Sequence, residues 1–248
     1  MKPGASEDDR LQERLRDPET RAEIRAAMLE PDGTWEPLGH LAGPHAVFPV
    51  GLRLPEHQAY RGRSLAEIAQ MRGQDWIDAG LDLIMNEPER IDSLYHLMTE
   101  ENIEAQLREP WVMLGSDAAG DDPARNTGVS LDGHPRAYGN FTRLLGHYVR
   151  ERGLMRLEEA VRRLTGLPAE HLRLQDRGEL REGAYADVVI FDPDTVSDQA
   201  TYTHPDRLSV GVRDVWVNGQ QTLKDGRHTG ALPGRRIYGP GAARTGVS

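Results

Sequence analysis

The chain has 248 residues, enough for one large domain or two small ones, and its 30 basic and 40 acidic side chains give a formal net charge of −10. This charge argues against nucleic acid and anionic membranes as partners, and no apolar run reaches the about 18 residues that a membrane-spanning helix requires. Cysteine is absent, which excludes disulfides and thiolate metal ligands and fits a reducing compartment, so we expect a cytoplasmic protein.

Helices are predicted over most of the chain before Pro110. The pair Asp17–Pro18 is typical of an N-cap with proline in the first turn, and Ser64–Glu67 reads as a capping box. Apolar residues at helical spacing over Ile77–Met85 predict a third helix, and a fourth is expected to start near Thr99. Between the first two helices, a loop-rich stretch contains one expected short strand at residues 46–50.

A candidate site follows a short apolar run. Trp111–Leu114 is flanked by helical sequence, which is typical of a buried parallel strand, and Gly115, Ser116 and Asp117 come directly after it. Active sites of α/β folds lie at the carboxyl ends of parallel strands. A carboxylate at Asp117 could ligate a divalent metal, or take a proton from metal-bound water and pass it on. The alternative is that Asp117 only caps a turn.

A second candidate cluster is His134, Arg136 and Tyr138, stiffened by Pro135. Arginine offers a planar fork of donors that suits a carboxylate, so this loop is a candidate substrate-binding site. The alternative is a helix approach in which Arg136 pairs with one of the many surface acids. The histidines show no spacing that would present two imidazoles to one metal from the same helix or strand.

The hydrophobic period changes near Leu174. Before it, amphipathic helices are predicted over 141–152 and 157–164; after it, Tyr185–Asp192 and Val212–Gly219 are rich in strand formers. Asn218–Gly219 indicates a tight hairpin turn. The resulting division is an α/β part at 1–173, a β part at 174–238 and a tail at 239–248.

Several segments of the chain together match the pattern of one known family: Trp111–Asp117, His134–Phe141, Glu158–Val161, Leu164–Ala169, Arg177–Asp192, Ala200–Tyr202 and Val217–Gly219. With these segments the chain resembles the N-acyl-D-amino-acid deacylases (D-aminoacylases) of the amidohydrolase superfamily. The resemblance implies an α/β fold: the last strands and helices of a (β/α)8 barrel, incomplete in this chain, followed by a small β-sandwich segment. It also implies a zinc-dependent hydrolase that splits N-acyl-D-amino acids into a carboxylate and a D-amino acid. Asp117 matches the catalytic, metal-site aspartate of that family.

The sequence departs from the family pattern in its metal ligands. The His-x-His of the family's first strand is absent, as are cysteine and any lysine between Lys2 and Lys224. One aspartate cannot hold a zinc ion that needs three or four ligands. Three hypotheses follow. The chain is the C-terminal portion of a deacylase from a truncated or split reading frame, inactive alone; or a non-catalytic interaction subunit that docks on a partner chain carrying the missing half; or an independently folded protein with another binding role. Because an incomplete barrel exposes sheet edges and apolar helix faces, a homo-oligomer is also expected.

Overall fold

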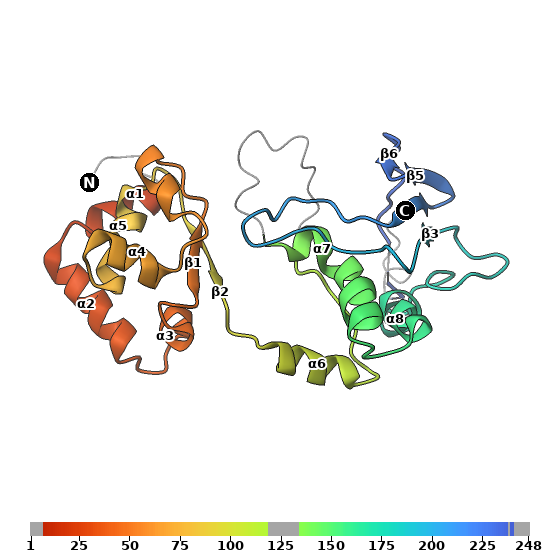
Figure 1. The fold of residues 1–248 in the computed structure, drawn as a ribbon, viewed down its shortest axis with the longest axis horizontal. Coiled ribbons are helices and arrows are strands. Elements are labelled where there is room, and N and C mark those ends of the chain that lie inside the picture. Colours follow the sequence, from red (N-terminus) through yellow and green to blue (C-terminus); the bar gives the residue numbers. More distant parts are fainter. Residues whose placement is uncertain (1–6, 119–133, 238, 241–248) are drawn as a thin grey trace. The chain divides into compact units, whose positions relative to one another are not determined.

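The computed structural model describes residues 7–118, 134–237 and 239–240, which form a mixture of helices and sheets in two compact units (Figure 1). The first unit comprises Met1–Thr99 with Asp122–His134, and the second comprises Glu100–Asp121 with Pro135–Ser248. The division predicted at 173/174 falls inside the second unit, so the domain boundaries inferred from the sequence stay a prediction. No helix in the described part of the chain is long and apolar enough to cross a membrane.

The first unit is mainly helical, with one pair of strands. Its elements are α1 (Glu7–Arg14), α2 (Pro18–Leu29), α3 (Leu38–Ala42), β1 (Val47–Val50), the 3-10 helix η1 (Pro55–Tyr60), α4 (Leu65–Arg72), α5 (Trp76–Asn86) and β2 (Asp92–Tyr95). Strand β1 pairs antiparallel with β2, with Phe48 opposite Leu94. Helices α4 and α5 pack on β1 through buried Ile68, Leu83 and Val47.

Two predicted helix starts in this unit are confirmed. The Asp17 carboxylate accepts the backbone N–H of Thr20 at 3.0 Å ahead of α2, with Pro18 as the first helical residue. The Ser64 hydroxyl accepts the backbone N–H of Glu67 at 3.3 Å, while the Glu67 carboxylate accepts the Ser64 N–H at 2.8 Å. Each cap satisfies backbone donors that the first helical turn leaves open.

A buried carboxylate joins the loop after β1 to the end of α5. Glu87 is 1% exposed, accepts the backbone N–H of Arg53 at 2.9 Å, and lies 2.6 Å from Nδ1 of the buried His57. A carboxylate is costly to bury unless it has partners of this kind. We therefore assign the His57–Glu87 pair a structural role in the first unit.

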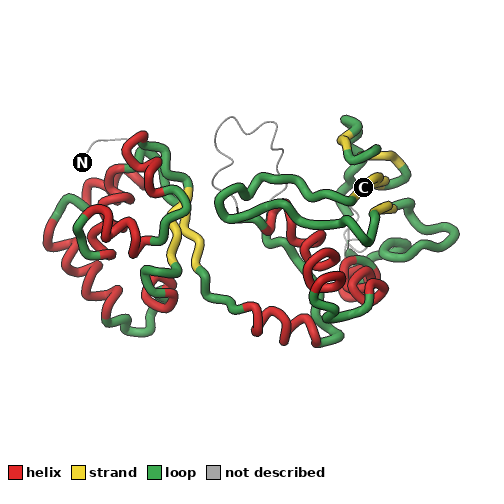
Figure 2. Tube along the Cα trace, in the orientation of Figure 1, coloured by secondary structure: helices red, strands yellow, loops and turns green. Residues whose placement is uncertain are grey.

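The second unit combines a helical layer with an antiparallel sheet (Figure 2). Its elements are α6 (Glu100–Arg108), α7 (Arg136–Arg143), the π-helical η3 (Leu144–Glu151), α8 (Leu157–Leu164), α9 (Gly166–His171), β3 (Val188–Phe191), β4 (Val212–Val217), β5 (Gln220–Lys224) and β6 (Arg227–His228). The strand order is β3-β4-β5-β6. The predicted hairpin turn is confirmed, since Asn218 and Gly219 both have positive φ, at 49° and 79°.

The core of the second unit lies between η3, α8 and the long loop that joins β3 to β4. Leu144, Tyr148, Ala160 and Val196 are buried together with Leu107 of α6. The predicted helices 141–152 and 157–164 are confirmed, and the structure joins α7 and η3 without a break. Helix α7 begins earlier than predicted, at Arg136, which places Arg136 and Tyr138 of the second candidate cluster on a helix, with His134 before its start.

One predicted strand is wrong. Trp111–Leu114 is not paired with any strand of the described residues, and Trp111 is 70% exposed. An apolar run indicates that a segment packs against other side chains. A strand also requires a neighbouring strand to pair with its backbone hydrogen-bonding groups. Both sheets of the described residues are antiparallel, and residues 174–237 contribute a single sheet. The barrel and the β-sandwich therefore stay predictions.

Candidate functional site

The segment that carries Asp117 is fixed at its start by α8. Arg162 donates to the carbonyl oxygen of Pro110 at 2.8 Å, and Arg163, only 3% exposed, donates to that of Leu107 at 2.6 Å. Both guanidinium groups also bind the carboxylate of Glu159, at 2.8 and 2.7 Å. Hydrogen bonds from these two arginines lower the pKa of Glu159 to about 2. The end of α6 and Pro110, two residues after it, are thus held by one ionic cluster.

Asp117 lies at the far end of this segment in an unusual backbone conformation. Its φ is +46°, in the left-handed region, and its side chain is 87% exposed. Its carboxylate lies 2.9 Å from a guanidinium nitrogen of Arg136 in the first turn of α7. The side chain of Asn140, one turn further along α7, donates to the carbonyl oxygen of Gly115 at 3.1 Å. Helix α7 therefore contacts both the carboxylate of Asp117 and the backbone before it.

Helix α7 is itself packed closely on the loop between β3 and β4. A Cβ at Gly139 would lie 2.7 Å from the Cβ of Asp198, so the helix approaches the loop more closely than any larger residue permits. The Ser209 hydroxyl donates to the carbonyl oxygen of Tyr138 at 2.9 Å and lies 2.6 Å from the Thr142 hydroxyl. These contacts fix both the position and the rotation of α7.

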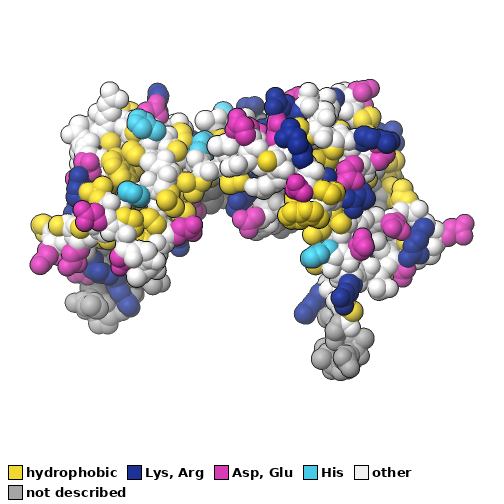
Figure 3. All heavy atoms as spheres, turned by 90° about the horizontal axis from the view of Figure 1, so that it is seen from below, with side chains coloured by type: hydrophobic (Ala, Val, Ile, Leu, Met, Phe, Trp, Pro, Cys, Tyr) yellow, Lys and Arg dark blue, Asp and Glu magenta, His cyan; other side chains and the backbone are white. Residues whose placement is uncertain are grey.

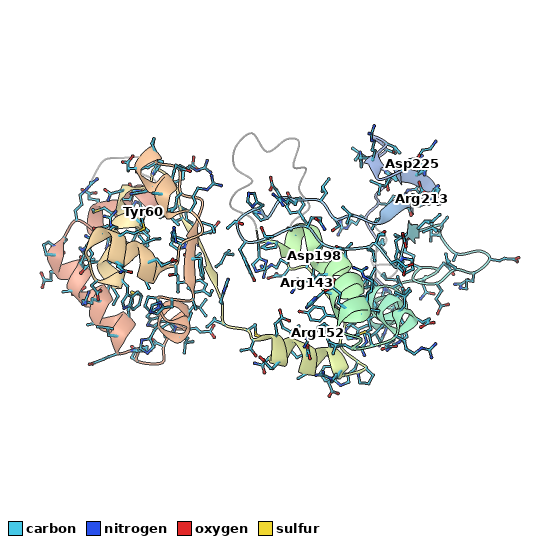
Figure 4. The ribbon with its side chains drawn as sticks, in the orientation of Figure 1. Tyr60, Arg143, Arg152, Asp198, Arg213 and Asp225 are labelled. Atoms are coloured by element: carbon cyan, nitrogen blue, oxygen red, sulfur yellow. The ribbon has the colours of Figure 1, made fainter. Side chains whose placement is uncertain are left out.

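Ionic contacts extend this packing along the same helical layer (Figure 4). Arg143 lies 3.4 Å from carboxylates of both Asp198 and Glu100, and the Tyr148 hydroxyl donates to Glu100 at 2.9 Å. Burial and the Glu100 carboxylate raise the pKa of Tyr148. The start of α6, α7 with η3, and the β3–β4 loop are thereby joined in one network next to the Asp117 segment.

The structure brings two of the four predicted site residues together. Asp117 and Arg136 form an ion pair, whereas Tyr138 is half-buried in α7, where its backbone carbonyl binds Ser209. His134 belongs to the first unit and is half-buried, so its place beside the pair stays a prediction. Sequence reasoning missed Asn140, although its position four residues after Arg136 puts both on one helix face.

The described residues around Asp117 do not by themselves form a zinc site. In residues 7–118, 134–237 and 239–240, no group of three or more histidine, aspartate or glutamate side chains lies close enough together to hold a metal ion. The carboxylate of Asp117 pairs with the guanidinium of Arg136, which is a cation and cannot ligate another cation. A tetrahedral zinc site needs three or four ligands, so these residues by themselves do not form one.

Apolar side chains reach the surface of both units, as Figure 3 shows for one face. In the second unit the most exposed include Trp111, Leu180, Leu208 and Leu232. Single exposed apolar residues are ordinary, and a contiguous patch is what marks an interface. Trp111 differs from the others because it begins the segment that leads to Asp117.

Comparison with known proteins gives the family. The model of the amidohydrolase family matches residues 40–223. Two curated relatives from Alcaligenes xylosoxydans xylosoxydans are similar: a D-aminoacylase, 38% identical over 174 residues (70% of this chain, 33% of the relative), and an N-acyl-D-glutamate deacylase, 42% identical over 163 residues (66% and 31%). The chain thus spans about a third of the length of these relatives.

Two solved structures are similar as well. One is the N-acyl-D-glutamate deacylase of Bordetella bronchiseptica with zinc and a phosphonate inhibitor that mimics the tetrahedral intermediate; it is 37% identical, with a TM-score of 0.60 over 77% of this chain and 38% of that one. The other is a D-aminoacylase, 33% identical, with a TM-score of 0.60 over 88% and 45%. The resemblance inferred from the motifs is confirmed, and the chain belongs to the amidohydrolase family.

Proposed function

We propose that this chain forms the C-terminal part of an N-acyl-D-amino-acid deacylase, which hydrolyses the amide to a carboxylate and a free D-amino acid. The observation that carries the proposal is the similarity of two thirds of the chain to three deacylases that differ in substrate side chain but share this reaction. Because these relatives share a reaction but differ in substrate, they support the reaction class proposed for this chain. They do not indicate which side chain its substrate amino acid carries.

In this proposal Asp117 is the catalytic residue. Its exposed carboxylate is free to reach a reacting group, and a positioned carboxylate can accept a proton and return it to the leaving nitrogen. Arg136 binds the substrate carboxylate, for which its planar fork of donors is suited. His134 and Tyr138 complete the substrate-binding surface. The Arg136–Asp117 ion pair is then the resting arrangement, which the substrate carboxylate replaces.

In this proposal Asp117 contributes one metal ligand, and the other ligands lie outside the part of the chain that the structure describes. The relatives include a deacylase solved with zinc and a D-aminoacylase with a binuclear metal centre. Because the described residues hold no suitable ligand group, we assign the other zinc ligands to a polypeptide that carries the remaining strands of the barrel. Residues 1–173 then complete that barrel and residues 174–238 its β-sandwich, and the chain alone is inactive.

A second candidate function is that of an interaction subunit without catalysis of its own. The Trp111–Leu114 segment favours it, because it pairs with no strand of the described residues and Trp111 is exposed. An apolar stretch of this kind gains hydrogen bonds and burial when a strand of another chain lies beside it. Under this alternative the chain would bind the same partner, but replacing Asp117 would leave the turnover of the complex unchanged.

Complementation tests both candidates. The full chain is mixed with the N-terminal two thirds of the similar D-aminoacylase and with zinc, and release of D-amino acid from N-acetyl-D-amino acids is measured, with the L-enantiomers as control. We expect turnover only in the mixture, and loss of about 10²–10⁴ in kcat for Asp117→Asn. A mixture in which Asp117→Asn is fully active favours the interaction subunit. A mixture that stays inactive contradicts the proposed function.

A further inference from the structure

The backbone of Asp117 adopts a conformation that needs support. Its φ of +46° lies in the left-handed region, where residues other than glycine are uncommon because the Cβ crowds the backbone. Aspartate tolerates this region better than most residues do, but tolerance alone does not select it. Contacts with the neighbouring structure must make this conformation the preferred one.

Two side chains of α7 provide such contacts. Arg136 binds the Asp117 carboxylate at 2.9 Å, and Asn140 donates to the Gly115 carbonyl at 3.1 Å, two residues before Asp117. Residues four apart lie on the same face of a helix, so both side chains reach the segment from one direction. Their effects differ, since Arg136 restrains the carboxylate whereas Asn140 restrains the backbone.

The arginine contact alone is a weak restraint. The two side chains are 42% and 87% exposed, and ion pairs this accessible contribute little because water screens them. If Arg136 turns to a substrate carboxylate, as the proposed function requires, its contact with Asp117 is lost in the bound state. The hydrogen bond from Asn140 does not involve either charged group, so it persists.

Asn140 also acts from a fixed support. The residue before it, Gly139, packs against Asp198 so closely that a Cβ would lie 2.7 Å away, and Thr142 contacts Ser209 at 2.6 Å. Helix α7 can therefore neither rotate nor slide without breaking these contacts. The Asn140 amide is presented to the Gly115 carbonyl by a helix whose place is set by the β3–β4 loop.

We propose that Asn140 is a positioning residue for Asp117, which holds the backbone of Gly115 so that the Asp117 carboxylate keeps its orientation when Arg136 is engaged by substrate. This proposal rests on the catalytic role proposed for Asp117. The geometry that it predicts, however, is a property of the second unit and needs neither metal nor substrate.

The first test measures the backbone of Asp117 in the full chain by NMR. In the left-handed region the amide proton and the Hα of a residue lie closer together than elsewhere, so a strong intraresidue NOE reports positive φ. We expect a strong NOE in the parent chain and loss of most of it in Asn140→Leu and in Asn140→Ala. An unchanged NOE in both folded variants overturns the proposal.

Asn86→Leu is the matched control. The side chain of Asn86 also donates from a helix to a backbone carbonyl, that of Asp82 at 2.7 Å, but it lies in the first unit. We expect the Asp117 NOE to be unchanged in this variant. If Asn86→Leu weakens it as much as Asn140→Leu does, the effect is a general loss of structure and the proposal is wrong.

The second test uses the active complemented mixture. We expect Asn140→Leu to lower kcat about tenfold, the loss that one hydrogen bond accounts for, with KM nearly unchanged, because positioning affects the reacting geometry and not substrate affinity. A change confined to KM contradicts the proposal. If Asp117→Asn proves fully active, the proposed function fails, and the NOE result still decides whether Asn140 sets the backbone.

Discussion

Glu159 offers a sharp test of how the Asp117 segment is anchored. Its carboxylate binds Arg162 and Arg163, and these arginines hold the carbonyl oxygens of Pro110 and Leu107. Replacing Glu159 by glutamine keeps the size of the side chain and removes the charge. Both guanidinium groups then lose their shared counter-ion, one of them in a buried position.

The pKa gives the magnitude and its pH dependence. The two arginines lower the pKa of Glu159 from its usual 4.5 to about 2. At about 1.4 kcal/mol per pKa unit the full shift sets an upper bound of about 3.4 kcal/mol, and water screens a side chain that is 29% exposed, so we expect on the order of 1–2 kcal/mol. A carboxyl group whose folded pKa is depressed stabilises the fold above its unfolded pKa. That stabilisation is lost as the pH falls from 4.5 towards 2.

The assay follows urea unfolding by hydrogen exchange on peptides from α6 and α8, at pH 7 and near pH 3. We expect Glu159→Gln to be less stable than the parent at pH 7 and the difference to shrink near pH 3. Glu158→Gln is the control, since Glu158 carries the same charge on the same helix but its ion pair, with Arg156 at 3.3 Å, is exposed. An equal difference at both pH values, or an equal effect of Glu158→Gln, would refute this account of the anchor.

Three further substitutions test the packing. Leu144→Ala removes a fully buried side chain and should cost about 2–5 kcal/mol in urea unfolding, whereas Phe141→Ala, at an exposed site, should cost far less. Gly211→Ala should lower the melting temperature more than Gly183→Ala, because both have positive φ but only at Gly211 would a Cβ lie 2.4 Å from backbone atoms. Glu87→Gln should cost about 1–3 kcal/mol, measured on peptides of the first unit, because it weakens hydrogen bonds to a buried charge.

The features that the sequence predicts correctly are those whose causes lie within a few residues. The Asp17 cap, the Ser64–Glu67 capping box and the Asn218–Gly219 turn each depend on a side chain and a backbone group that are close along the chain. Helices 141–152 and 157–164 follow from an apolar face that repeats every turn. All the residues that determine these features lie within the local sequence, so they can be predicted without knowing which distant residues pack against them.

The features that the sequence does not predict depend on partners far along the chain. The sequence does not predict strand β2, because Asp92–Tyr95 alternates weakly and becomes a strand through pairing with β1. Trp111–Leu114 has the composition of a buried strand but lacks strands beside it in the described residues. Strand formation is decided by neighbours as much as by composition, and composition is all that a short segment reveals.

The candidate site lies between these extremes. Asp117 and Arg136 are both recognisable as residue types that suit acid–base chemistry and carboxylate binding, but nothing in their spacing shows that they meet. The alternative prediction for Arg136 was a pairing with a surface acid, and the structure pairs it with Asp117. The Arg136–Asp117 ion pair therefore agrees with both interpretations of Arg136: pairing with an acid and binding of a substrate carboxylate. To bind Arg136, a substrate carboxylate would have to replace Asp117.

The conformation of the Asp117 segment is set within the second unit alone. Arg162 holds its start at Pro110, and Asn140 holds Gly115 near its end, so α8 and α7 both supply contacts that place Asp117. Position and activity can consequently be separated by experiment. An Asp117 that keeps its positive φ in the chain alone, and becomes active only with the complementing polypeptide, would mean that this unit supplies a preformed carboxylate and the partner supplies the metal site.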